Sequence, residues 1–137
     1  RPFLIGLTHD IGKAILLRAF AEISDKKKLD IDAVLTSMQQ AHVSVGSYLL
    51  KRWGFAEDFI KIVMRHESND IEGDAHPDLV LISFVNQLTR NIGFSIHKGQ
   101  TDLSELPAAR ILKLTPEKIA DFEAKLKELL SDVSHLF

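Results

Sequence analysis

Cysteine is absent from the 137 residues of the chain. Disulfide bonds, thiolate nucleophiles and cysteine-based zinc sites are therefore excluded. The absence fits a reducing compartment. Because the sequence also shows no signal peptide, we expect a cytoplasmic protein.

Long hydrophobic runs and an excess of one charge are also lacking. The longest apolar run, residues 79–85, contains a serine and is far too short to span a bilayer. The net charge is -2, and residues 26–28 form the only cationic run, which we expect to be a solvated loop. Non-specific nucleic-acid binding requires many phosphate contacts. The sequence therefore favours neither a membrane protein nor a nucleic-acid binder.

The composition that remains is ordinary for a globular domain. Hydrophobic residues make up 45% of the chain and charged residues 26%. A chain of this length suits one domain and can bury about two thirds of its unfolded surface. Repeats, low-complexity tracts and linkers are not visible, so we predict a single domain over residues 1–137.

Apolar residues recur at helical spacing, and no stretch shows the sustained alternation of a strand. We therefore predict an all-α fold. Asp30 is a candidate N-cap, Gly54 suits the position after a helix end, and Thr115 precedes a proline and an acid as in a helix start. The helices that we expect cover residues 3–7, 15–23, 31–38, 45–53, 59–66, 79–92 and 119–130, with one short helix within 103–114 and loops at 68–77 and 93–99.

An adjacent His9–Asp10 pair interrupts an apolar segment near the start of the chain. An imidazole and a carboxylate are both ligands for divalent metals. Lys13 follows His9 by four residues, so on a helix it would share that face and could hold a phosphate oxygen. The alternative is structural: the pair satisfies itself or caps a helix, and Lys13 is solvated. The residues alone leave both interpretations open.

Two more histidines decide whether the pair belongs to a site. Helices folded back on one another could bring His9, Asp10, His42 and His66 to one inner cleft, a set suited to manganese, iron or zinc. The alternatives are that His42 hydrogen-bonds a backbone carbonyl and that His66 favours a helix C-terminus as a cation. We assign no site role to the remaining histidines, which are His76, His97 and His135.

Three segments resemble a known family. Residues 4–13, LIGLTHDIGK, are similar to the central motif of the HD superfamily of metal-dependent phosphohydrolases. Residues 41–55 resemble the second block of its HDOD branch (HD-related output domain), and residues 60–67 the third, followed by a C-terminal helix after 114–117. The resemblance implies a compact helical bundle of bacterial signalling proteins, often beside receiver or other regulatory modules. It also implies that N-terminal helices precede Arg1 and are missing from this chain.

The departures from the resemblance matter as much as the matches. Catalytic HD phosphohydrolases carry a further His, which would lie upstream of Arg1, and a final Asp, for which the nearest candidate here is Asn86. Asparagine is a neutral and weaker ligand than aspartate. The cyclic-dinucleotide phosphodiesterases have paired histidines where this chain has Arg65–His66. They also have a Gly-Tyr-Pro loop where it has residues 68–73.

We therefore predict a non-catalytic signalling module with a degenerate HD metal site. Its predicted partners are other signalling domains or proteins, with a nucleotide as a candidate ligand. The alternative is a metal-dependent phosphohydrolase or phosphodiesterase acting on nucleotides or cyclic dinucleotides. In that case His9, Asp10, His42 and His66 would hold manganese, iron or zinc, and Lys13 would hold the substrate phosphate. In the non-catalytic case either no metal or one of these ions is expected.

A further expectation concerns the apolar start of the chain. If helices are missing upstream, Phe3, Leu4 and Leu7 lose their cover. Exposed apolar patches tend to be buried by association. We therefore expect this chain to self-associate.

Overall fold

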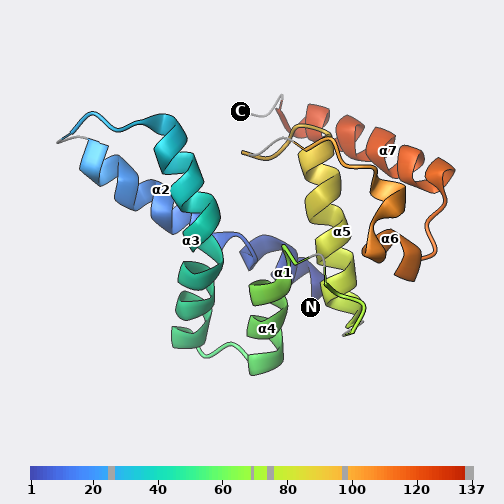
Figure 1. Cartoon of the computed structure of the whole chain (residues 1–137), viewed down its shortest axis with the longest axis horizontal. Coiled ribbons are helices and arrows are strands. Elements are labelled where there is room, and N and C mark those ends of the chain that lie inside the picture. Colours follow the sequence, from blue (N-terminus) through green and yellow to red (C-terminus); the bar gives the residue numbers. More distant parts are fainter. Residues whose placement is uncertain (25–26, 69, 74–75, 97–98, 135–137) are drawn as a thin grey trace. The chain divides into compact units, whose positions relative to one another are not determined.

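The computed structural model describes residues 1–24, 27–68, 70–73, 76–96 and 99–134, and this part of the chain contains helices and no strand. The predicted all-α fold is confirmed. The chain forms two compact units, Arg1–Glu67 and Ser68–Phe137, which are described separately below (Figure 1). One domain can contain two such units, so the single domain over 1–137 stays a prediction.

The first unit contains helices α1 (Pro2–Thr8), α2 (Ile11–Ser24), α3 (Ile31–Arg52) and α4 (Glu57–Arg65). Helix α3 packs along α2 on one side and along α4 on the other, and α1 contacts α4 (Figure 1). The buried apolar side chains of this unit come from all of these helices except α2: Ile5, Met38, Leu50, Phe59, Ile60, Ile62 and Val63.

Helix α3 differs from the sequence prediction of two helices. It runs without a break for 22 residues, so that His42 lies in its middle instead of at the start of a second helix. Residues 39–44 are mostly polar or small, but they include neither proline nor glycine, so no residue breaks the helix there. The two predicted helix ends are confirmed. Asp30 is the N-cap and accepts hydrogen bonds from the backbone N–H groups of Asp32 and Ala33, and Gly54, after the helix end, has φ 77°.

Glycine allows α2 to touch the backbone of α3. A Cβ atom on Gly12 would lie 1.9 Å from the carbonyl oxygen of His42 and 2.8 Å from the backbone nitrogen of Gly46. No side chain could replace the hydrogen of Gly12 without moving one helix. This close approach fixes the start of α2, and with it Asp10, beside the turn of α3 that carries His42.

The second unit contains α5 (Pro77–Asn91), a short 3-10 helix η1 (Leu103–Glu105), α6 (Pro107–Ile111) and α7 (Pro116–Ser134). The prediction of one short helix within 103–114 is wrong, because Leu106 adopts an extended conformation before Pro107 and separates η1 from α6. At the start of α7 the Thr115 hydroxyl accepts a hydrogen bond from the N–H of Lys118, as predicted.

Several sequence predictions concern residues that the structure does not describe, or describes only in part. The lysine run 26–28 and the predicted loops 68–77 and 93–99 lie partly outside the described residues, and His97 and His135 lie wholly outside them. Phe3 and Leu7 are exposed on α1, at 81% and 67%. Within the described ranges, no helix combines the length and apolarity needed to cross a membrane.

Candidate metal centre

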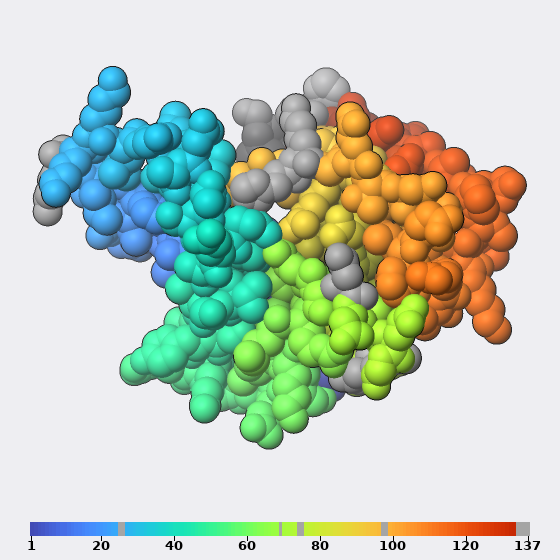
Figure 2. Space-filling model, in the orientation of Figure 1, coloured from blue at the N-terminus to red at the C-terminus, as the bar shows by residue number. Residues whose placement is uncertain are grey.

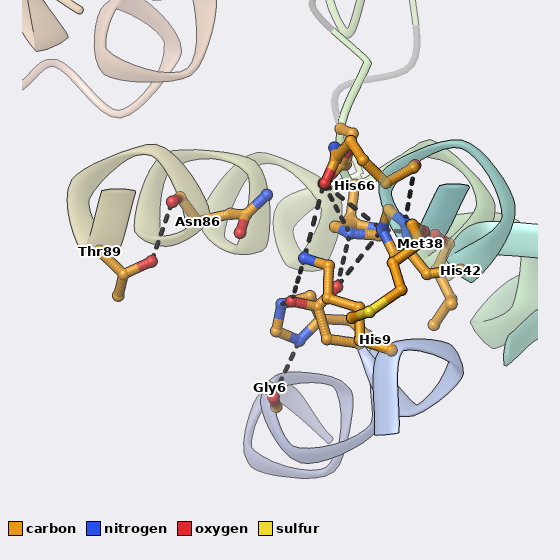
Figure 3. A network of polar contacts seen from close by, with 12 residues as sticks. Gly6, His9, Met38, His42, His66, Asn86 and Thr89 are labelled. Atoms are coloured by element: carbon orange, nitrogen blue, oxygen red, sulfur yellow. Dashed lines mark hydrogen bonds and ion pairs between the residues drawn. The ribbon is translucent and has the colours of Figure 1, made fainter. Parts of the chain in front are cut away.

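Three of the predicted ligands meet in the first unit, together with one residue that the sequence analysis did not select. Asp10, His42, His66 and Glu67 place one ligand atom each within 4.8 Å of all the others. Asp10 joins α1 to α2, His42 lies in the middle of α3, and His66 caps the end of α4. Figure 3 shows the side chains of His42 and His66 close together within the network of polar contacts.

The orientation of both histidines is set by their own helices. The Nδ1 atom of His42 lies 2.9 Å from the carbonyl oxygen of Gln39 and 3.1 Å from that of Met38. The Nδ1 atom of His66 lies 2.6 Å from the carbonyl oxygen of Val63. Because a carbonyl only accepts, each Nδ1 donates, and in the neutral ring Nε2 then carries the lone pair. Both lone pairs face the cluster.

The inward atoms of the cluster have no hydrogen-bond partner. Asp10 Oδ1, His42 Nε2 and His66 Nε2 are all buried and unsatisfied. Asp10 Oδ1 lies 3.4 Å from each of the two Nε2 atoms. Buried polar groups are normally paired, and a positive charge among these three acceptors would satisfy all of them.

Glu67 and Lys13 complete the charge distribution. Glu67 Oε1 lies 3.4 Å from His42 Nε2 and 3.8 Å from His66 Nε2, and its other oxygen accepts a hydrogen bond from Gln39. Lys13 is buried, with its Nζ atom 2.7 Å from Asp10 Oδ2 and 3.9 Å from Glu67 Oε1. The alternative in which Lys13 is solvated is therefore wrong.

Asp10 stays ionised in this environment. Burial acts to raise the pKa of its carboxyl group, but opposing contacts, among them the Lys13 ammonium group at 2.7 Å, outweigh burial and hold that pKa well below its usual range. Two carboxylates and one ammonium group give the cluster a net charge of about -1 with neutral histidines, which favours a bound cation.

His9 lies beside the cluster and is not part of it. Its Nδ1 atom is 2.9 Å from the carbonyl oxygen of Gly6, and its Nε2 atom is 3.6 Å from Asp10 Oδ2. The ring packs edge-on against His66 at 4.9 Å between centroids. Burial lowers the pKa of His9, so the ring favours its neutral form. Glu67 is the fourth member of this cluster, and the role of His9 as a metal ligand stays a prediction.

Two further residues that the sequence analysis named, His76 and Asn86, belong to the second unit. His76 caps α5, and its Nδ1 atom accepts a hydrogen bond from the N–H of Asp78. Asn86 is a buried residue of α5 in the second unit, and its side-chain nitrogen has no hydrogen-bond partner. The correspondence of Asn86 to the final Asp of HD enzymes stays a prediction.

The spacing of Asp10 Oδ1 from the two imidazole nitrogens fits one divalent ion, whereas Glu67 Oε1, 3.8 Å from His66 Nε2, lies farther out. Atoms held ~2.1 Å from a single ion lie about 3.0 to 3.4 Å apart in octahedral or tetrahedral coordination. The distances of 3.4 Å from Asp10 Oδ1 to the two imidazole nitrogens match that range. Two imidazoles and two carboxylates suit manganese, iron or zinc. The Nδ1 hydrogen bonds to backbone carbonyls are those that commonly orient metal-binding histidines.

The HDOD domain family matches residues 1–69, which is half of the chain and includes every residue of the cluster. The C-terminal helix that the sequence analysis joined to the resemblance lies beyond the matched range. Neither a curated protein nor a solved structure matches the chain. The chain belongs to the HDOD domain family, the HD-related output modules of signalling proteins.

Proposed function

We propose that the chain is a signalling output module whose HD-type cluster binds one divalent metal ion without hydrolysing phosphoesters. The observation that carries the proposal is the convergence of three buried and unsatisfied atoms, Asp10 Oδ1, His42 Nε2 and His66 Nε2. Glu67 Oε1 would be the fourth ligand atom. The partners of the chain would be other signalling domains or proteins.

The ligands come from segments that are far apart in the sequence. When bound, the ion would supply a positive charge that links the α1–α2 junction, the middle of α3 and the end of α4. Without the ion, the hydrogen-bond acceptor that each segment contributes faces an acceptor of another segment. A metal would therefore stabilise the arrangement that the family match covers, and with it the surface that a partner protein would recognise.

The absence of catalysis is supported by the residues around the cluster. The ammonium group of Lys13 is paired with Asp10, so its positive charge already compensates a carboxylate of the cluster. The four candidate ligand atoms form a single cluster that offers one atom per residue, whereas phosphodiester hydrolysis commonly uses two metal ions. The sequence also lacks the Gly-Tyr-Pro loop of the phosphodiesterase branch.

A metal-dependent phosphohydrolase is the second candidate, and Lys13 favours it. Its Nζ atom lies against the ligand carboxylates at 2.7 and 3.9 Å. A phosphate oxygen near the ion would thus also be near a buried cation, as transition-state stabilisation requires. In this candidate nucleotides or cyclic dinucleotides would be the substrates.

Calorimetric titration of the metal-free protein with Mn²⁺ tests the binding half of the proposal. We expect one ion per chain for the wild type, and affinity reduced on the order of 100-fold or more for Asp10→Asn, which keeps the side-chain shape but removes the charge. Asp121→Asn, on the exposed face of α7, is the matched control and should bind as the wild type does. Equal affinity in all three proteins would remove the cluster as the site.

Turnover separates the two candidates. Metal-loaded wild type, metal-free wild type and Asp10→Asn are each incubated with bis(p-nitrophenyl) phosphate, nucleotides and cyclic dinucleotides. We expect the same background rate from all three proteins. Hydrolysis that requires the metal and disappears in Asp10→Asn would contradict the non-catalytic proposal and establish the phosphohydrolase.

A further inference from the structure

Helix α7 carries an apolar stripe with the spacing of a coiled coil. The stripe residues follow one another at intervals of three and four, and they are Ile119, Phe122, Leu126, Leu129 and Val133. This is the a and d pattern of a heptad repeat, which is narrower than the apolar face of an ordinary core helix. We call these five residues the α7 seam.

Most of the α7 seam is exposed in the part of the chain that the structure describes. Ile119 is buried, but Phe122, Leu129 and Val133 are 45%, 62% and 48% exposed. Figure 2 shows the atoms of α7, in orange to red, at the surface of the second unit. Exposed apolar surface in a contiguous stripe marks a site of interaction.

The seam forms one wall of an apolar groove of about 520 Å³ within the second unit. The opposite side comes from α5, with Leu81, Phe84, Val85 and Leu88, and Leu112 and Leu114, between α6 and α7, complete the lining. Lys125 is the only charged residue in the lining, and it is paired with Asp121 at 2.7 Å. Sites for small polar ligands carry several placed polar groups, which this groove lacks. An apolar helix face fits it better.

The charges beside the seam are complementary to those of a second α7. With Ile119 at position a, Lys118 occupies position g and Glu123 position e. In a parallel pair of helices, a residue at g faces the e residue five positions later in the partner. Lys118 therefore meets Glu123 of the other copy, and two-fold symmetry makes the pair twice. Neither side chain has an ion-pair partner within the described part of its own chain.

We infer that the α7 seam is a self-association surface, on which a second copy of this chain packs its own α7 in parallel. Helix α7 has 19 residues, fewer than three heptads, and so short a coiled coil is marginal by itself. The α5 wall supplies the missing apolar area, so that the α5 and α7 helices of two copies would form one four-helix core. This surface shares no residue with the metal centre, so neither proposal depends on the other.

Sedimentation velocity of the full chain, from low to high micromolar concentration, tests the inference. We expect the wild type to shift from monomer to dimer and Leu129→Glu to stay monomeric over the same range. Leu129 is exposed, so this change leaves the fold intact, which circular dichroism verifies. Lys127→Glu, at an exposed position of the same helix outside the seam, is the control and should dimerise as the wild type does.

A charge exchange tests the parallel register. Lys118→Glu and Glu123→Lys should each weaken the dimer roughly 5-fold, because each replaces two attractive pairs by two repulsive ones. The double variant should restore the wild-type dissociation constant. Additive weakening in the double variant would overturn the parallel register.

If something other than a second α7 occupies the seam, or if the chain associates through another surface, the experiments give different results. A wild type that stays monomeric at every concentration overturns the inference, and so does a dimer that persists in Leu129→Glu. Loss of the dimer on Leu7→Ser instead would place the contact on α1. Saturable uptake of the fluorescent probe anilinonaphthalene sulfonate by a monomer, abolished in Leu129→Glu, would identify a small-ligand groove and would equally overturn it.

Discussion

The chemistry of the cluster follows from which ring nitrogen each histidine gives to the backbone. His42 and His66 lie in or at the end of a helix, where Nδ1 reaches a carbonyl three or four residues earlier. Their Nε2 atoms are left to face Asp10, and neither finds a proton donor there. A bound metal ion, as proposed, would make these buried acceptors compatible with one another.

Replacing Lys13 should lower the stability of the metal-free protein and increase the stability that it gains from bound metal. In Lys13→Met the carboxylates of Asp10 and Glu67 lose their buried counter-charge. We expect the metal-free variant to lose about 1–3 kcal/mol of unfolding free energy. Saturating Mn²⁺ should recover more stability in the variant than in the wild type, because the ion then neutralises both carboxylates alone.

Urea denaturation with and without Mn²⁺ measures this effect. Arg18→Met is the control, because Arg18 pairs with Glu22 on the exposed face of α2. Its free energy of unfolding should change by less than about 1 kcal/mol, as is usual for surface ion pairs. Equal losses in the two variants would mean that Lys13 does not neutralise the cluster.

The sequence identified most of the cluster but not all of it. Asp10, His42 and His66 stood out because imidazoles and a paired carboxylate are rare in apolar helices. Glu67 was missed because acids at helix ends are usually solvated, and its contact with Gln39, 28 residues away, has no local signature. Its position directly after His66 was the one available signal.

At the scale of elements, the site depends on one close contact between helices. Gly12 lets the start of α2 lie against the backbone of α3 at His42 and Gly46. The ligand Asp10 precedes this contact by two residues and His42 forms part of it. A shift of one helix would therefore move one ligand relative to another.

Gly12→Ala should damage both stability and metal binding. The added methyl group would lie 1.9 Å from the His42 carbonyl oxygen, so the two helices must separate. Overpacking of this kind costs about 1–3 kcal/mol or more. Thermal unfolding and Mn²⁺ titration measure the two losses.

Gly6→Ala is the matched control, because nothing lies within 4 Å of a Cβ atom at Gly6 in α1. Alanine there should leave stability unchanged or raise it by up to ~1 kcal/mol. If Gly12→Ala behaved like this control, the close contact of α2 with α3 would not position the ligands.

The sequence predicted helices well where caps are strong and less well where they are absent. Asp30, Gly54 and Thr115 mark helix ends by side-chain hydrogen bonding or positive φ, and all three were identified. The unbroken course of α3 was missed because its polar middle faces a binding cluster instead of an apolar core. The separation of η1 from α6 follows from Pro107, whose effect on Leu106 the sequence analysis did not use.

At the scale of the whole molecule, metal binding should stabilise the folded state by mass action. At a concentration 100 times its dissociation constant, a ligand adds about 2.7 kcal/mol. For a chain of this size that corresponds to a rise in Tm of roughly 5–10 °C. Differential scanning calorimetry of the wild type with Mn²⁺ should show the rise, and excess EDTA should reverse it.

The same scan on Asp10→Asn gives the control for that prediction. Its Tm should respond little to Mn²⁺, because the charge of one ligand is gone. An equal rise in both proteins would indicate that the ion acts at another place, and no rise in the wild type would count against a metal centre altogether.

Elemental analysis of the chain tests the central claim most directly. The wild type is incubated with Mn²⁺, Fe²⁺ or Zn²⁺, desalted and measured beside His66→Ala, Asp10→Asn and His76→Asn, with circular dichroism to verify folding. His76→Asn removes an imidazole outside the cluster and keeps an acceptor at the α5 cap. We predict about one ion per chain in the wild type and in His76→Asn, and loss of the ion in the other two. A wild type that retains no ion, or cluster variants that retain as much as the wild type, would contradict the account.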